Sequence, residues 1–356
     1  MLCIYRKFGG TMKALNDRIE TLDYLRGFAL LGIILVNVEV ILSILPLERR
    51  VDIVYKHILD YFVEGKFFSI FSILFGVGFY IFMQRAQARH DHAQKLFVRR
   101  LVILAAIGFV HQFFHDGEAL LPYAIYGFVI LVLFFNRSKQ VNVTVGLILL
   151  VIFSLMGAKL LLPLAYFILG LSAAQYGLLH TFYRHRHVWR RIAVISGLLS
   201  CVAVGIMYYF SNMVHDGFIT HGVTSTVAEE DWDEAVYTYV VLLCGPVLTC
   251  FYISGLITVL NTVWGQKLLY PLKAYGRMAL TNYIGQTVLL WLVVRISHDK
   301  DWHFATTFWL CLTILCVQML FSQIWLHYCR LGPLEYVWKM GTYQKRLPLL
   351  KGKSYK

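Results

Sequence analysis

The sequence predicts an all-helical protein that crosses a membrane about ten times. It is 58% hydrophobic and 15% charged, whereas soluble domains are roughly 25% charged. Apolar runs of roughly 17 to 25 residues, long enough to span a bilayer as helices, recur along the whole chain. We expect a tail at 1–21, a single transmembrane domain at 22–329 and a basic tail at 330–356, with no separate soluble domain.

Each expected span is an apolar run bounded by charged or turn-forming residues. We interpret the first run as a retained helix rather than a signal peptide, because it contains Asn37 and Glu39 and no small-residue cleavage site follows. The fifth and sixth runs are divided where Gly157 and Pro163 flank Lys159, since together they are too long for one span. The ten spans are 22–45, 67–83, 96–114, 119–135, 141–157, 160–179, 192–211, 235–260, 276–294 and 305–328.

The distribution of Lys and Arg predicts the orientation of these spans. With the N-terminus inside, the cytoplasmic segments hold 25 of the 33 basic residues and the outer loops hold 7, while Arg26 lies within the first span. This bias places both termini in the cytoplasm. The net charge of +13 then reflects topology and affinity for anionic lipids. No nucleic-acid motif accompanies it, and the acidic outer loop 212–234 is expected to be solvated.

The cysteines indicate neither a metal site nor a disulfide framework. Their number is odd, none forms a Cys-x-x-Cys pair, and most fall inside apolar runs, where cysteine behaves as a small apolar residue. They are Cys3, Cys201, Cys244, Cys250, Cys311, Cys316 and Cys329.

The first span carries polar residues along one face. Asp23 and Arg26 are three residues apart and can pair. Arg26 and Asn37 are eleven apart, so they face within about 20° of each other and about 16 Å apart along the axis. Lipid binding by a snorkelling Arg26 is the alternative. Gly27 and Gly32 would let another helix approach closely.

The stretch "GFVHQFFHDGEALLPY" places four ionisable residues at the outer end of the third span. His111 is the deeper histidine and His115 is the one nearer to water. Ionisable residues within spans are rare and often functional, and a carboxylate beside an imidazole fixes its tautomer. We expect His111 to be a general base oriented by Asp116 or Glu118, and His115 to line the interface.

The ninth span, "YGRMALTNYIGQTVLL", is the third polar stretch. Arg277 stands at its cytoplasmic start, as Arg99 and Arg100 do in the third span. Thr281 and Gln286 are expected to form hydrogen bonds between helices. Asn282 is a candidate binding residue.

Five blocks of the sequence resemble, in order, a known family. They are "TLDYLRGFALLGIILVN", "GKFFSIFSILFGVGFYIF", "RRLVILAAIGFVHQFFHDGEALLPYAIYG", "YGRMALTNYIGQ" and "GPLEYVWKMGTY". Together they look like the YeiB-like bacterial multi-spanning membrane proteins (domain of unknown function 418). The resemblance implies a multi-pass protein of the bacterial cytoplasmic membrane. In the family pattern a histidine precedes an acidic pair, which here corresponds to His111, Asp116 and Glu118. The family often has Asp where this chain has Glu118.

The first block is also similar to transmembrane acyltransferases of the heparan-alpha-glucosaminide N-acetyltransferase type. This similarity implies transfer of an acyl group from cytoplasmic acyl-coenzyme A to a small-molecule, glycan or lipid acceptor at the outer face, with no permanently bound cofactor. The histidine of that group follows the first span, where this chain has only His57 without the surrounding motif, so its role is not carried over.

On this expectation His111 is the base and Asn37 holds the acyl carbonyl or its oxyanion. The residues expected to bind the donor are Asp23, Arg26, Arg99, Arg100, Arg277 and Asn282. One alternative is a transporter that uses Asp23, Arg26, Glu39 and His111 as a polar pathway, and another is a non-catalytic scaffold. An enzyme predicts a tunnel from a basic inner mouth to His111, a transporter predicts alternating access, and a scaffold predicts a buried, satisfied His111.

Overall fold

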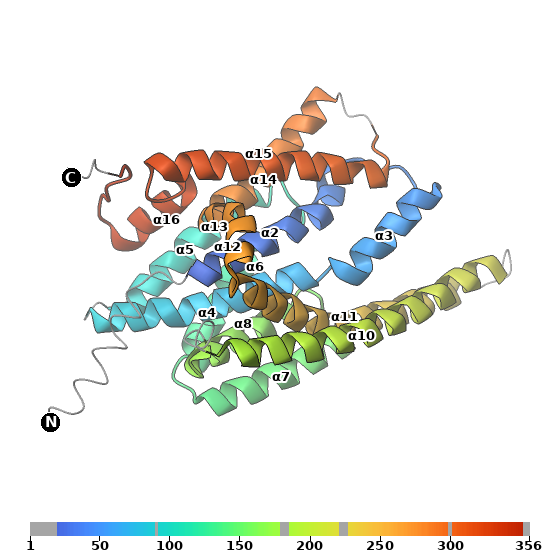
Figure 1. Ribbon diagram of the computed structural model, residues 1–356, viewed down its shortest axis with the longest axis horizontal. Coiled ribbons are helices and arrows are strands. Elements are labelled where there is room, and N and C mark those ends of the chain that lie inside the picture. The colour runs from blue at the N-terminus through green and yellow to red at the C-terminus, as the bar shows by residue number, and fades with distance from the viewer. Residues whose placement is uncertain (1–19, 90–91, 179–184, 221–226, 298–300, 352–356) are drawn as a thin grey trace.

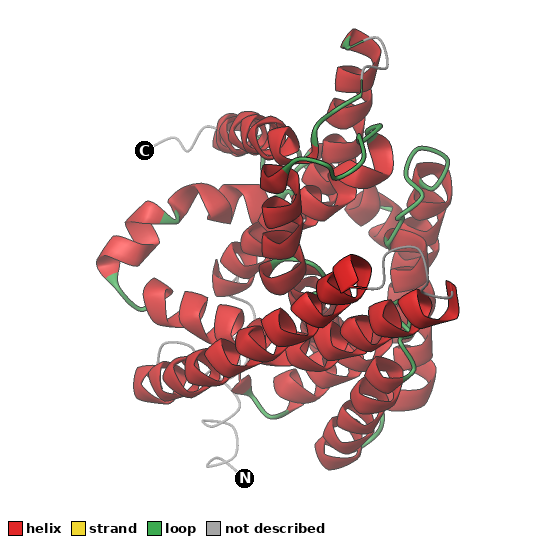
Figure 2. Cartoon of the chain, turned by 90° about the vertical axis from the view of Figure 1, so that its right-hand side faces the viewer, coloured by secondary structure: helices red, strands yellow, loops and turns green. Residues whose placement is uncertain are grey.

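The computed structural model describes residues 20–89, 92–178, 185–220, 227–297 and 301–351, with the backbone alone for 212–220 and 227–234. Within these ranges the chain is helical and contains no strand, and most loops are short (Figure 2). The helices are α2 (Glu20–Ile41), α3 (Arg50–Phe62), α4 (Lys66–Ala88), α5 (Ala93–His111), α6 (Leu120–Val129), η1 (Ile130–Phe134), α7 (Lys139–Leu155), α8 (Leu162–Gln175), α10 (Arg186–Thr220), α11 (Val227–Leu260), α12 (Val263–Leu268), α13 (Tyr270–Arg277), α14 (Ala279–Ile296), η3 (Phe304–Thr306), α15 (Thr307–Tyr328) and α16 (Pro333–Tyr343).

Several of these helices are long and apolar enough to cross a membrane, which makes the chain a multi-pass membrane protein. Six candidate segments of the described chain meet that criterion: 20–41, 50–88, 186–211, 235–260, 279–296 and 304–328. Three apolar helices are shorter, at 120–134, 139–155 and 162–175. Every expected span coincides with a helix, and the third corresponds to α5. Ten crossings and cytoplasmic termini remain predictions.

Close contacts between glycines and backbone hold the central helices together. A Cβ built on Gly27 would lie 2.2 Å from the carbonyl oxygen of Leu272, and one on Gly276 would lie 1.9 Å from that of Asp23. Helices α2 and α13 therefore touch backbone to backbone, as predicted from Gly27. Gly76 lets α4 approach α8 in the same way. The predicted turn near Gly157, which has a φ of 65°, separates α7 from α8.

Helices α10 and α11 form a long antiparallel pair at one edge of the molecule (Figure 1). Helix α10 continues to Thr220 and helix α11 begins at Val227. Much of the predicted loop 212–234 is therefore helical rather than irregular. Residues 221–226 and the predicted tail up to residue 19 are outside the described residues.

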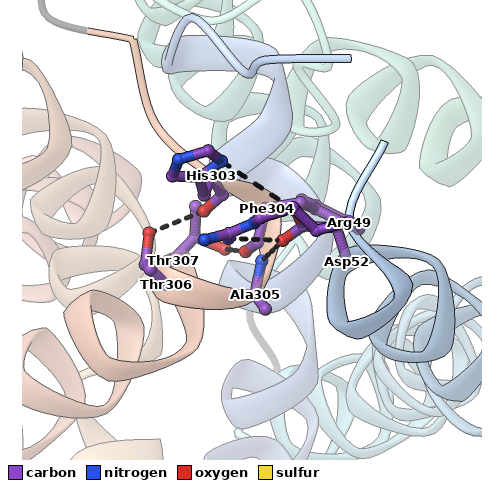
Figure 3. Close-up of polar contacts among 7 residues, drawn as sticks. All are labelled: Arg49, Asp52, His303, Phe304, Ala305, Thr306 and Thr307. Carbon is purple, nitrogen blue, oxygen red and sulfur yellow. Dashed lines mark hydrogen bonds and ion pairs between the residues drawn. The ribbon is translucent and has the colours of Figure 1, made fainter. Parts of the chain in front are cut away.

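The segment between the first two spans contains helix α3, which the sequence did not predict because its charged residues interrupt the apolar pattern. Buried Asp52 on α3 accepts hydrogen bonds from Arg49 Nε (2.7 Å) and from the backbone N–H of Ala305 (2.7 Å), and His303 lies 4.0 Å away (Figure 3). Asp52 thus joins α3 to η3, the short helix that leads into α15, because a carboxylate satisfies the unpaired N–H groups of a helix N-terminus.

Candidate functional site

A cavity of about 660 Å³ lies among α2, α4, α5, α6, α13, α14 and α16. One part of its wall is basic. Seven cations line it, and Glu335 is the one acid among the described residues that do so. The cations are Arg26, Arg85, Arg89, Arg100, Arg277, Lys339 and Lys345. They come from the first half of α2, the end of α4, the first half of α5, the end of α13 and the C-terminal segment, all at the end of the molecule expected to be cytoplasmic.

Three of the four arginines predicted to bind a donor line this cavity: Arg26, Arg100 and Arg277, but not Arg99. Arg26 Nη1 lies 3.3 Å from Oδ1 of Asp23, which is buried. Arg26 therefore faces the bundle and its predicted partner instead of extending to lipid headgroups.

Arg100 is held by aromatic rings. Its guanidinium carbon lies 3.5 Å from the centre of the Trp338 ring and 5.5 Å from that of Phe82. Trp338 Nε1 also donates to the carbonyl oxygen of Arg100 at 2.8 Å. Because guanidinium faces stack well on aromatic rings, α16 and α5 fix this cation at the cavity wall. Helix α16 belongs to the segment that the sequence predicted only as a basic tail.

The carboxylate of Glu335 on α16 is hydrogen-bonded to the first residues of α14. Its carboxylate accepts hydrogen bonds from the backbone N–H of Leu280 (2.7 Å) and Thr281 (3.1 Å) and from the Thr281 hydroxyl (2.6 Å). The carboxylate charge is therefore directed at the α14 N-terminus, where the helix dipole stabilises it. The basic character of the cavity is largely preserved.

Away from the cations the cavity is lined by apolar and aromatic side chains, and Leu120 and Tyr283 lie at its walls. Arg100 and Leu104 line it from one face of α5. His111 is seven residues beyond Leu104, so it continues the same face about 10 Å further along the helix. The cavity residues and His111 therefore form one line along α5.

His111 is buried and both of its ring nitrogens have partners, as the scaffold alternative predicts, and it is not among the residues that line the cavity. Nδ1 contacts the carboxylate of Glu118, and Nε2 lies 2.9 Å from the hydroxyl of Thr287 on α14. The ring of Tyr283 packs against it at a centroid distance of 5.3 Å. Tyr283 also lines the cavity, so one side chain contacts both the cavity and the imidazole.

Of the two predicted carboxylates, it is Glu118 that contacts His111. The second oxygen of Glu118 accepts the backbone N–H of Leu120, and its side chain is 4% exposed. Asp116 is exposed to solvent. A buried carboxylate with both oxygens engaged can hold an imidazole in one orientation and one tautomer.

His115 is buried as well, but its surroundings keep it uncharged. The pKa of His115 is lowered to about 4, mainly by burial and also by nearby His111, although Glu118 and Asp116 act in the opposite direction. Its Nδ1 accepts the backbone N–H of Gly117 at 3.3 Å. This histidine packs within the loop after α5 and is as buried as His111, so burial does not distinguish the two histidines in the way that the sequence predicted.

The remaining predicted site residues make no hydrogen bond with His111 within the described part of the chain. Asn37 is buried on α2, and among the described residues it forms no hydrogen bond with His111 or Glu118. Asn282 does not line the cavity. Its amide donates to the carbonyl of Tyr275 (2.8 Å) and to Ser322 (2.9 Å), so it joins helices. Glu39 lies 3.9 Å from Lys56.

Two residues that the sequence interpretation missed adjoin His111: Tyr283 and Thr287 on α14. They are four residues apart and therefore share a face, offset by one position from the face of Asn282 and Gln286. The sequence feature that could have identified them is their spacing, which gives the ninth span a second polar face. The hydroxyl of Tyr283 is buried and makes no hydrogen bond of ordinary length and angle with the described residues.

Comparisons with known proteins give relatives without an assigned activity. Residues 173–345 match a family model described as a protein of unknown function, DUF418. The chain is 41% identical to an uncharacterised 39.9 kDa protein in the amylase 3′ region of Bacillus acidopullulyticus, over 95% of this chain and 97% of the relative. It is 26% identical to YxaH of Bacillus subtilis and 24% identical to YeiB of Escherichia coli, each over 94% of this chain and 97% and 98% of the relative. No solved structure matches.

Proposed function

Since this chain belongs to the DUF418 family of proteins of unknown function, we propose an activity from its own site: transfer of an acyl group from cytoplasmic acyl-coenzyme A to an acceptor at the outer face of the membrane. The observation that carries this proposal is the cavity. It begins among seven cations and reaches Tyr283, which packs on the His111–Glu118 pair.

The basic part of the cavity suits the nucleotide end of the donor. Coenzyme A carries several phosphate groups, and arginines bind phosphate through paired hydrogen bonds. Arg100 stacked on Trp338 offers a fixed guanidinium there. Arg100 and His111 are eleven residues apart on α5, about 16 Å along the helix. The long arm of coenzyme A would follow this line and bring the thioester towards His111.

The inner end suits acyl transfer. Glu118 contacts Nδ1 of His111, which leaves Nε2 to take a proton from an attacking hydroxyl or amine. The Tyr283 hydroxyl, buried at the cavity wall without an ordinary hydrogen bond among the described residues, would donate to the acyl oxygen as negative charge develops. Asn37 stays a second proposed donor for the same oxygen.

The acceptor would enter from the opposite side. His111 ends α5, and the loop after it exposes Phe113, Phe114 and Asp116. In the proposed orientation, with both termini inside a bacterial cytoplasmic membrane, this loop faces outwards. Neither donor nor acceptor would then have to cross the membrane for the acyl group to do so.

Calorimetry with acetyl-coenzyme A on the purified protein tests the donor site. We expect binding that weakens as salt rises, because charged contacts are screened, and slow release of the free thiol when an amine or alcohol is supplied. Arg100→Gln should weaken binding more than Arg99→Gln, its neighbour outside the cavity. Absence of binding at low salt, together with binding of a transported solute, would favour the transporter interpretation.

A further inference from the structure

The atom next to His111 Nε2 is the hydroxyl of Thr287, at 2.9 Å. Glu118, His111 and Thr287 thus stand in the order acid, base and hydroxyl. We propose that Thr287 is the nucleophile of the reaction: it takes the acyl group from the donor as an ester and then passes it to the acceptor. This inference rests on the proposed acyl transfer and adds a covalent intermediate to it.

The hydrogen bonding of Thr287 distinguishes it from other hydroxyls on the spanning helices. Thr249, Ser254 and Thr313 each donate to the carbonyl oxygen four residues earlier, at 2.9, 2.7 and 2.8 Å. That is the usual way in which a helix satisfies a hydroxyl inside a membrane. Within the described residues the hydrogen bond of Thr287 is with His111 alone. Its hydroxyl is therefore directed at a base and away from its own backbone.

The partners of His111 fix the direction of proton transfer. When the carboxylate of Glu118 accepts the Nδ1 proton, Nε2 presents its lone pair to the Thr287 hydroxyl. A hydroxyl is a weak nucleophile until an adjacent base takes its proton, and a base works best when a third group orients it. His111, Glu118 and Thr287 are each no more than 4% exposed at the side chain, so water competes little for that proton.

Thr287 also lies next to the end of the cavity. Tyr283, four residues earlier on α14, lines the cavity and packs on His111. Thr287 is one turn further on, about 6 Å along the helix. A thioester that reaches Tyr283 from the basic end would meet the Thr287 hydroxyl after a side-chain movement of Tyr283.

The proposed reaction has two balanced steps. In the first, Thr287 Oγ attacks the thioester carbonyl, its proton passes to His111 Nε2, the C–S bond breaks and the departing thiolate takes the proton. In the second, an acceptor hydroxyl or amine attacks the threonine ester and gives its proton to His111. The ester C–O bond then breaks, and His111 returns the proton to Thr287. No oxidant or further reactant is needed.

Mass spectrometry of the detergent-purified full-length protein tests this step. After incubation with acetyl-coenzyme A and no acceptor, we expect one acetyl group on the peptide that contains Thr287 and a burst of about one free thiol per protein. Thr287→Val should lose the label and the burst, while Thr287→Ser should keep both. Thr313→Val is the matched control, since Thr313 is exposed on α15 and bonds to its own backbone, and it should be labelled normally.

Three outcomes would overturn the inference while acyl transfer still stands: turnover by Thr287→Val at the wild-type rate, an acetyl group found on a different residue, or steady turnover without a label or a burst. If Thr287→Val does not fold, the labelled position in the wild-type protein and in Thr287→Ser decides. Absence of acetyl-coenzyme A binding and turnover in the wild-type protein would instead refute the proposed function, and this inference with it.

Discussion

Helix α14 carries two polar faces that differ in what they contact. On one, Asn282 and Gln286 bond to other helices. The Gln286 amide donates to the Tyr275 hydroxyl (2.8 Å) and to the carbonyl oxygen of Leu30 on α2 (3.2 Å). Gln318 on α15 donates to the carbonyl oxygen of Asn282 at 3.0 Å. These contacts join α14 to α2, α13 and α15.

The other face carries Tyr283 and Thr287 and meets α5. Here the Thr287 hydroxyl bonds to an ionisable ring, His111, and Tyr283 borders a cavity. The comparison shows that polarity inside a span does not by itself indicate function. What separates the two faces is whether the partners are packed amides and hydroxyls or a base beside an open space. Single substitutions can test this separation.

Removal of the base should have the largest effect. We expect His111→Gln to lower acetyl transfer by on the order of 10³-fold, because general base catalysis contributes between 10² and 10⁴. Thiol release measured with acceptor present gives the rate, and binding of acetyl-coenzyme A should change little. A transfer rate within a few-fold of wild type would mean that the face of α14 that carries Tyr283 and Thr287 has only a structural role, like the opposite face.

The orienting carboxylate should come next. Glu118→Gln is expected to lower transfer by on the order of 10²-fold, since the imidazole loses its fixed tautomer. Asp116→Asn is the control of matched chemistry: it lies in the same loop but is exposed, so its rate should stay near that of wild type. Equal losses in both variants would show that the charge of the loop matters and the contact does not.

Cavity cations should affect the donor and leave the chemistry unchanged. We expect Arg26→Ala to raise the Kd of acetyl-coenzyme A about tenfold, given that a bond to a charged group contributes roughly 1.5–3 kcal/mol. Arg26→Lys should restore only part of this, because an ammonium lacks the guanidinium fork. Calorimetry at two salt concentrations measures both. Loss of folded protein in Arg26→Ala would instead indicate that buried Asp23 needs its partner.

The opposite face of α14 should affect stability alone. Asn282→Ala is expected to lower the free energy of unfolding by about 1 kcal/mol, the usual contribution of a hydrogen bond between membrane helices. Thermal unfolding in detergent measures this, and transfer per folded molecule should match wild type. A loss of acetyl-coenzyme A binding without a loss of stability would instead show that Asn282 belongs to the donor-binding site, as the sequence predicted.

The smallest effect is expected at His115. Its pKa is lowered to about 4 in the folded chain, so between pH 6.5 and 4 the unfolded chain binds a proton that the folded chain does not. Stability should therefore fall as the pH decreases through that window. Comparing the melting temperature of wild type and His115→Gln at pH 7 and pH 5 isolates this contribution. Parallel pH profiles of the two proteins would contradict it.

Much of the fold could be predicted from local sequence, because each span satisfies its own backbone and is visible as an apolar run. Gly157 and Pro163 located a turn within such a run for the same local reason. Helices α3 and α16 were missed since their charges interrupt the apolar pattern. They are nonetheless fixed by tertiary contacts, Asp52 to Ala305 and Trp338 to Arg100.

The candidate site was predictable only where its residues are close in sequence. His111 and Glu118 are seven residues apart and joined by a short loop, so their contact could be expected. Thr287 lies 176 residues from His111, and nothing in the sequence brings these two together. The cavity depends on side chains from seven helices, so its basic wall and its far end emerge only once those helices are packed.

Helix α16 also determines when, during synthesis, the protein becomes able to bind the donor. It leaves the ribosome after α15 and the helices before it, yet Trp338 covers Arg100 and Glu335 engages the start of α14. During synthesis, the earlier helices would already be inserted while the basic wall of the cavity was still incomplete. A nascent chain held just before Pro333 should therefore be membrane-integrated and unable to retain the donor, which would couple ligand binding to completion of translation.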